Sequence, residues 1–182
     1  MNLPNSLRAL QHRNFRLFLV GQGTSQIGNW VQLIATSWLV YRLSGSTLML
    51  GLSAFSLQIP MLLITPFAGV FIDRLNVRRV LFATNALAMT QSLVMLALMI
   101  SGHIEAWHVV VGNAVLGLGN AFDAPARQAL ISKLLPNRQE LTNAIALNST
   151  VMNGARFIGP MLGGLITATF GEIWSFAVNC IM

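Results

Sequence analysis

Arg156 is a charged side chain inside a long segment, residues 141–170, that carries no other charge. At helical spacing it shares a face with Ser149 and Asn153. A guanidinium near the middle of a membrane span costs at least about 2.5 kcal/mol on insertion scales, so it normally faces protein, water or an anionic ligand. We expect Arg156 to line a cavity, where it would suit an anionic or amphipathic substrate. The alternative is a structural contact with a helix carbonyl or a carboxylate.

A polar stripe runs along the first long apolar segment. Its six side chains are Gln22, Ser25, Gln26, Asn29, Gln32 and Thr36. At about 100° per residue they fall within a sector of roughly 120° on a helix. Unpaired amides in hydrocarbon cost several kcal/mol each, so the stripe predicts either a substrate path or interhelical hydrogen bonds. Because it contains no carboxylate, it offers no obvious site for proton exchange.

These patterns predict a cavity lined by polar side chains of several segments. The candidates are Gln22, Gln26, Asn29, Gln32, Thr36, Asn113, Asn153 and Arg156. Asp123 precedes Arg127 by four residues, which favours an ion pair on one helix over a proton-exchange role for the carboxylate. His103, Glu105 and His108 lack a defined ligand spacing, so we expect no metal site. We also expect no cofactor and no enzymatic activity, since the sequence shows no nucleophile–base constellation or phosphate loop.

The composition indicates that these residues lie in a membrane protein. Hydrophobic residues make up 54% of the 182 and charged residues only 9%, against about 25% charged in soluble proteins. Mean hydropathy is +0.65. The net charge of +6 comes from basic residues in short segments beside apolar spans, so it indicates membrane orientation rather than nucleic-acid binding.

The apolar segments predict an all-α, polytopic membrane helix bundle. We expect five complete spans, at residues 15–41, 47–72, 80–101, 107–132 and 141–170. A sixth begins near Ile173, and the ten residues from Ile173 to Met182 would extend only about 15 Å, half of a roughly 30 Å hydrocarbon core. Residues 1–14 form the expected N-terminal segment, with no removable signal peptide, and residues 15–182 form one transmembrane domain.

The distribution of Lys and Arg predicts a cytoplasmic N-terminus in the plasma membrane. With that orientation nine basic residues lie inside and only Arg42 lies outside; the nine are Arg8, Arg13, Arg16, Arg74, Arg78, Arg79, Arg127, Lys133 and Arg138.

Two motifs add a family resemblance. The stretch from Gly69 to Arg79 resembles the loop between the second and third helices of the major facilitator superfamily, with Gly69, Asp73, Arg74 and Arg78 in matching places. Residues 155–164 resemble the fifth-helix motif of its antiporters, and the matching residues are Gly159, Pro160, Gly163 and Gly164. Residues 14–18, 122–129 and 143–149 resemble a bacterial branch of drug and enterobactin exporters, so an inner-membrane location is implied.

The resemblance implies the amino-terminal six-helix half of a twelve-helix transporter, with the sixth helix truncated. Such a protein would export small amphipathic molecules by alternating access, with Asp73, Arg74, Arg78 and Arg79 forming half of an inner gate. Its partners would be the lipid bilayer, the small-molecule substrate and the missing carboxy-terminal half. We therefore expect an amino-terminal fragment that does not transport alone. The alternative is a scaffold or regulatory subunit that associates through the glycines of the fifth helix.

Two residues depart from the family pattern. Asn113 stands where the superfamily often has an arginine implicated in proton coupling, so coupling through that arginine is not expected here. Asn76 stands where glycine is usual in the loop motif, and we expect it to be tolerated because Asn adopts the left-handed conformation more readily than most residues.

Overall fold

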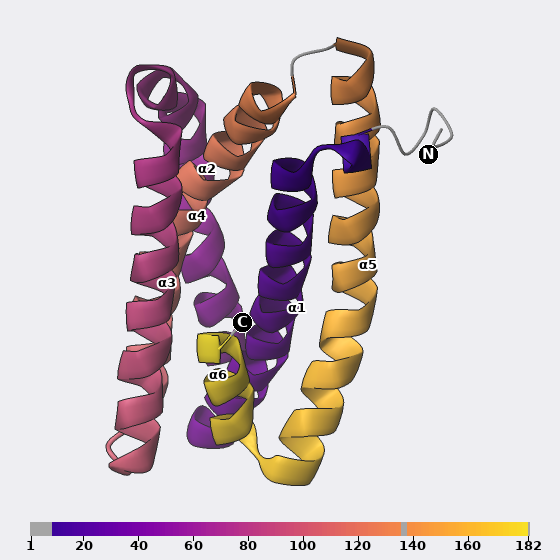
Figure 1. The fold of residues 1–182 in the computed structure, drawn as a ribbon. Coiled ribbons are helices and arrows are strands. Elements are labelled where there is room, and N and C mark those ends of the chain that lie inside the picture. The colour runs from indigo at the N-terminus through magenta and orange to yellow at the C-terminus, as the bar shows by residue number, and fades with distance from the viewer. Residues whose placement is uncertain (1–8, 136–137, 182) are drawn as a thin grey trace.

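The computed structural model describes residues 9–135 and 138–181, which form six α-helices (Figure 1). They are α1 (Arg13–Ser44), α2 (Thr47–Arg74), α3 (Val77–Ile100), α4 (Ala106–Leu134), α5 (Arg138–Phe170) and α6 (Glu172–Ile181). These ranges contain no strand. The predicted all-α fold is therefore confirmed, and each expected helix end lies within three residues of the observed one.

The connection between α2 and α3 is shorter than the sequence suggested. Arg78 and Arg79 lie in the first turn of α3, so only Leu75 and Asn76 separate the two helices. Asn76 does not use the left-handed conformation that we expected: its φ is −75°, and its Oδ1 accepts a hydrogen bond of 3.1 Å from the Arg78 amide. The turn is thus stabilised by an N-cap, because an exposed amide oxygen satisfies one of the free amides of the first turn.

Consecutive long helices run in opposite directions, so the connections alternate between the two ends of the bundle (Figure 1). The start of α1, the α2–α3 turn, the end of α4 and the start of α5 share one end, which we call the basic end. Arg13, Arg16, Arg74, Arg78, Arg79 and Lys133 lie there. Arg42 lies at the opposite end, where its Nε is 3.1 Å from Glu172 Oε1 at the start of α6.

The helices pack mainly in pairs, α1 against α5 and α2 against α4, while α3 packs on α4 and α6 packs on α1 and α3. Glycines set the closest approaches. A Cβ at Gly163 would lie 2.9 Å from the Val31 Cα, and one at Gly117 would lie 2.3 Å from the Leu57 carbonyl oxygen. Both distances are shorter than van der Waals contact, so only glycine allows these helices to approach so closely.

Apolar clusters fill both ends of the bundle interior. Near the basic end Phe15, Leu19 and Ile131 join α1 to α4, and near the opposite end Leu39, Met95 and Phe176 join α1, α3 and α6. The outer surface is also apolar, with Leu62, Phe82 and Phe157 each more than two-thirds exposed. Apolar side chains on the surface as well as in the core are typical of a bundle surrounded by lipid.

Two helical segments, Thr47–Ile72 and Val77–Ile100, are long and apolar enough to cross a membrane by length and composition. The spans that we expected at α1, α4 and α5 stay predictions: these helices are 32, 29 and 33 residues long but carry more polar side chains. Where those side chains lie decides which of them could serve a function.

Candidate functional site

The polar stripe of α1 divides between the bundle interior and its surface. Gln22, Gln32 and Thr36 are buried, with 3 to 5% of their surface exposed. Gln26 is half-buried, and Asn29 is exposed. The stripe therefore does not form one continuous lining in this structure.

Gln32 lies at the centre of a buried amide network that joins three helices. Its Nε2 donates to Gln91 Oε1 at 3.2 Å, and its Oε1 accepts from Ser92 Oγ at 2.8 Å, both on α3. Asn179 of α6 donates to Gln32 Oε1 and, at 3.2 Å, to Ser92 Oγ. At Gln32 the polar stripe therefore forms interhelical hydrogen bonds, the predicted alternative to a substrate path. Gln91, Ser92 and Asn179 were not predicted from the sequence, because nothing local pairs them with a residue at least 59 positions away.

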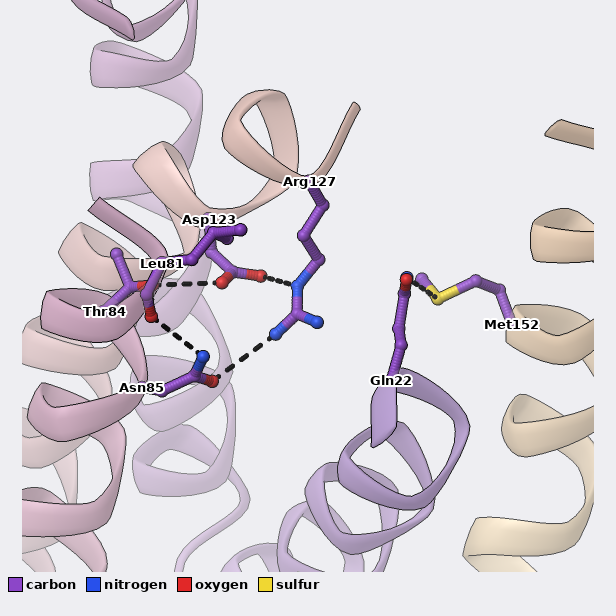
Figure 2. A network of polar contacts seen from close by, with 7 residues as sticks. All are labelled: Gln22, Leu81, Thr84, Asn85, Asp123, Arg127 and Met152. Atoms are coloured by element: carbon purple, nitrogen blue, oxygen red, sulfur yellow. Dashed lines mark hydrogen bonds and ion pairs between the residues drawn. The ribbon is translucent and has the colours of Figure 1, made fainter. Parts of the chain in front are cut away.

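Two other candidates also bond across helices. Gln22 donates from Nε2 to the Met152 sulfur on α5 at 3.3 Å (Figure 2), and among the described residues its Oε1 has no hydrogen-bond partner. Asn113 of α4 is buried and donates from Nδ2 to the Ser53 carbonyl at 3.1 Å and to Ser53 Oγ at 2.8 Å on α2. The residue at the position of the missing arginine thus joins α4 to α2.

A second group of candidates lies on the surface at the middle of α1 and α5. Arg156 and Asn153 of α5 are exposed, as is Asn29 of α1. The guanidinium carbon of Arg156 lies 5.6 Å from the centroid of the Trp30 ring, within the range of a cation–π contact. We call Asn29, Trp30, Asn153 and Arg156 the α1–α5 patch. Within the part of the chain that the structure describes, Arg156 forms no ion pair.

The α1–α5 patch depends on close packing beneath it. Ala155 is only 3% exposed, and a Cβ at Gly159 would lie 2.4 Å from the Trp30 Cβ. Small residues on the inner side of α5 therefore bring the Trp30 backbone against this helix. Trp30 was not predicted as a site residue, because an apolar aromatic residue in a long apolar segment carries no signal of its own. The glycine spacing of α5, which was predicted, places Trp30 beside Arg156.

The predicted ion pair between Asp123 and Arg127 is present one turn apart on α4, and both side chains are largely buried. Two α3 residues complete the network shown in Figure 2. Thr84 Oγ1 donates to Asp123 Oδ1 at 3.0 Å, and Arg127 Nη2 donates to Asn85 Oδ1 at 3.4 Å. With both charges compensated and bonded to a second helix, the arrangement suits the joining of α3 to α4.

A groove of about 460 Å³ opens near the basic end between α2, α4 and α5. Its lining is mostly apolar and includes one residue of the loop motif: Gly69, Ile72, Pro125, Gln128, Ala129, Ile131, Ser132, Leu141 and Ile145. Within the described ranges α2 makes no contact with α5, so these helices flank the groove without closing it.

The arginines of the loop motif are exposed at the same end of the bundle as this groove. Arg74 lies in the last turn of α2, where a cation is favoured by the helix dipole. Arg78 and Arg79 lie in the first turn of α3, where a cation is disfavoured. Asp73 lies in the last turn of α2, and its side chain is outside the described part of the structure. The helix dipole therefore does not account for Arg78 and Arg79, whereas the positive-inside rule accounts for basic residues at this end.

The opposite end carries no candidate for chemistry in the described part. Glu105 caps α4, with its Oε2 accepting from Trp107 Nε1 at 2.6 Å and its backbone amide donating to His108 Nδ1 at 3.1 Å. No group of three or more His, Cys, Asp or Glu side chains within residues 9–135 and 138–181 could hold a metal ion.

The apolar bundle surface and the glycine contacts between helices are typical of a class of protein, the helical membrane proteins. Comparison with known families identifies it further. A profile of the transmembrane secretion effector family matches residues 5–182, so the chain belongs to this family of major facilitator superfamily transporters. Its relatives are transporters and not enzymes.

Three relatives illustrate the similarity. The multidrug efflux pump Tap of Mycolicibacterium fortuitum is 32% identical over 86% of this chain and 39% of its own length. The staphyloferrin A transporter of Staphylococcus aureus is 28% identical over 85% of this chain and 39% of its own length. The macrolide efflux protein A of Streptococcus pyogenes is 20% identical over 84% and 37%, respectively. The chain thus spans about two-fifths of the length of the curated relatives it matches.

Proposed function

We propose that this chain forms the amino-terminal part of an exporter that moves small amphipathic molecules across the bacterial inner membrane by alternating access. The observation that carries this proposal is the α1–α5 patch. Arg156 lies 14 residues from the nearer end of α5, or about 21 Å along the helix. An exposed guanidinium at that depth cannot face lipid without a large cost, so the patch needs water, substrate or further protein against it.

The groove at the basic end supports the same proposal. In an alternating-access cycle, the two halves of a transporter separate at one membrane face and close at the other. The exposed arginines at the same end, two of them in the first turn of α3, suit an inner gate whose partner carboxylates lie on another half. Placing this end in the cytoplasm agrees with the positive-inside rule.

The alternative, a scaffold or regulatory subunit that associates through α5, has less support. Gly159 and Gly163 already face α1 at distances that exclude any other helix. Among the motif glycines only Gly164 has no described atom within 4 Å of its Cβ position. One open glycine offers a smaller association surface than the repeated small residues of helix-pairing motifs.

The test compares the full gene product with residues 1–182 in inverted membrane vesicles that accumulate a fluorescent amphipathic dye. We expect saturable, energy-dependent accumulation by the full gene product and none by residues 1–182 alone, because the gate and the cavity would each lack their opposing surface. Saturable flux by the 182-residue chain would contradict the expectation that a second half is required. Cross-linking of that chain to another, complete transporter would favour the alternative.

A further inference from the structure

The proposed function leaves open which amphipathic molecules the exporter accepts. We propose that the α1–α5 patch selects anions, with the guanidinium of Arg156 binding a carboxylate or sulfonate group and Trp30 contacting the adjoining aromatic or apolar part. This inference rests on the proposed function for the site but concerns the charge of its ligand.

The first argument is the position of the acidic side chains. Each of the four carboxylates whose side chains the structure describes already has a partner, so none is left to neutralise Arg156. The pairs are Glu105 with Trp107, Asp123 with Arg127, Glu140 with His12, and Glu172 with Arg42. The α1–α5 patch therefore carries a positive charge without a described counter-ion.

The second argument is the state of the guanidinium. Trp30 supplies a π face at 5.6 Å but no oxygen acceptor. Within the described residues Arg156 has no ion-pair partner either. Its N–H donors form a planar fork that matches the two oxygens of a carboxylate or two oxygens of a sulfonate. An anion at this position would satisfy donors that would otherwise be desolvated without partners when the site closes.

The third argument is what surrounds the charge. The amides of Asn29 and Asn153 offer neutral hydrogen bonds beside it, and both are exposed. Phe157, the next residue of α5, is apolar and 83% exposed. A charged centre beside an indole fits a ligand with one anionic group on an apolar body. A cationic ligand would instead meet a like charge in a region of low dielectric constant, which disfavours its binding.

The experiment uses two probes that share one ring system and differ by a single sulfonate group. Anilinonaphthalene sulfonate carries a sulfonate on the ring system of phenylnaphthylamine, which is neutral. Binding of each probe to the full gene product, in nanodiscs of zwitterionic lipid, is followed by probe fluorescence. The variants are R156Q and R156K, with R16Q as the control because Arg16 is an exposed arginine at the basic end, away from the patch.

We expect R156Q to raise the Kd for the sulfonate probe by about 10-fold or more, the usual effect of losing one hydrogen bond to a charged group. The Kd for the neutral probe should stay within about twofold. R156K, which keeps the charge but loses the planar fork, should give a smaller rise for the sulfonate probe. R16Q should change neither Kd.

Equal changes for both probes in R156Q, or no change for either, would overturn the anion proposal and assign Arg156 to structure. If R156Q does not give a monodisperse protein, the Kd values of the two probes for R156K test the anion proposal instead. Dye accumulation separates the two proposals. Transport of the neutral probe without Arg156-dependent anion selectivity leaves the exporter proposal standing and removes this one. If the full gene product binds the sulfonate probe in an Arg156-dependent way but transports neither probe, the anion proposal stands and the exporter proposal is removed.

Discussion

Gly159 of α5 lies directly against Trp30 of α1, so that a Cβ at position 159 would come within 2.4 Å of the Trp30 Cβ. Three residues earlier on α5, Arg156 lies with its guanidinium 5.6 Å from the ring of the same tryptophan. The glycine of the family motif and the arginine of the candidate site therefore contact one residue. The motif does more than pack two helices, because it determines which side chain lies beside the charge.

Replacing Gly159 with alanine should destabilise the bundle by about 1–3 kcal/mol, the usual cost of overpacking a close contact. The new methyl group must push Trp30 away, and the Arg156–Trp30 contact should weaken with it. Thermal unfolding can be followed through Cys180, the only cysteine, which is half-buried in α6 and should react with a thiol-reactive dye as the bundle opens.

Gly164→Ala is the matched control, since no described atom lies within 4 Å of a Cβ at that position. It should leave stability unchanged or raise it by up to about 1 kcal/mol, because alanine favours the helix. Equal effects of the two substitutions would mean that the Gly159 contact does not limit the approach of α1 and α5.

The amide network around Gln32 supports a second prediction, which concerns the stability of the protein. Gln32→Leu should destabilise the protein by about 1–3 kcal/mol, because Gln91, Ser92 and Asn179 would be left without their shared partner in the interior. Far-UV circular dichroism during thermal unfolding measures the loss.

Thr90→Ala serves as the control for this network, since Thr90 is exposed and, among the described residues, bonds only to the Ala86 carbonyl of its own helix. Its effect should stay within about 0.5 kcal/mol. A Q32L protein as stable as the T90A protein would show that the network adds nothing to stability and would return Gln32 to the list of substrate contacts.

The sequence predicted the helices well because long uncharged segments and their breakers are local signals. The α2–α3 turn shows where such signals end. Four charges in seven residues indicated a loop, yet Arg78 and Arg79 belong to the first turn of α3, since capping by Asn76 allows a helix to begin amid charged residues.

The candidate site was less predictable for a related reason. Helical periodicity identifies which α1 residues share a face, but the neighbours of that face are decided by packing. Gln32 and Asn29 lie three residues apart in one polar stripe, and only the positions of α3 and α6 make the first buried and leave the second exposed. Trp30 could not be identified from its type alone; its value lies in its distance from Arg156.

The Asp123–Arg127 pair supports a third prediction. Asp123→Asn keeps an acceptor for Thr84 but removes the charge that faces a largely buried guanidinium. We expect a loss of up to about 3 kcal/mol, because breaking a buried pair from one side leaves an uncompensated charge.

The double variant D123N/R127Q should recover much of that loss, since it removes both charges together. A double-mutant cycle on the unfolding midpoint measures the difference. If the double variant is as unstable as the sum of the two single variants, the residues contribute separately through Thr84 and Asn85 and not as an ion pair.

Substitutions of Arg74 and Arg78, on the two sides of the α2–α3 turn, should change the stability of the protein in opposite directions. Arg74→Gln removes a cation from the last turn of α2 and should destabilise the protein by about 0.3–1 kcal/mol, whereas Arg78→Gln removes one from the first turn of α3 and should stabilise it by a similar amount. Unfolding at low ionic strength measures both, because salt screens the effect.

If the arginines serve the proposed inner gate, R78Q should nevertheless lower dye accumulation by the full gene product. A more stable variant that transports less would separate the role of Arg78 from folding, while a destabilised R78Q protein would mean that this arginine has a stabilising partner after all.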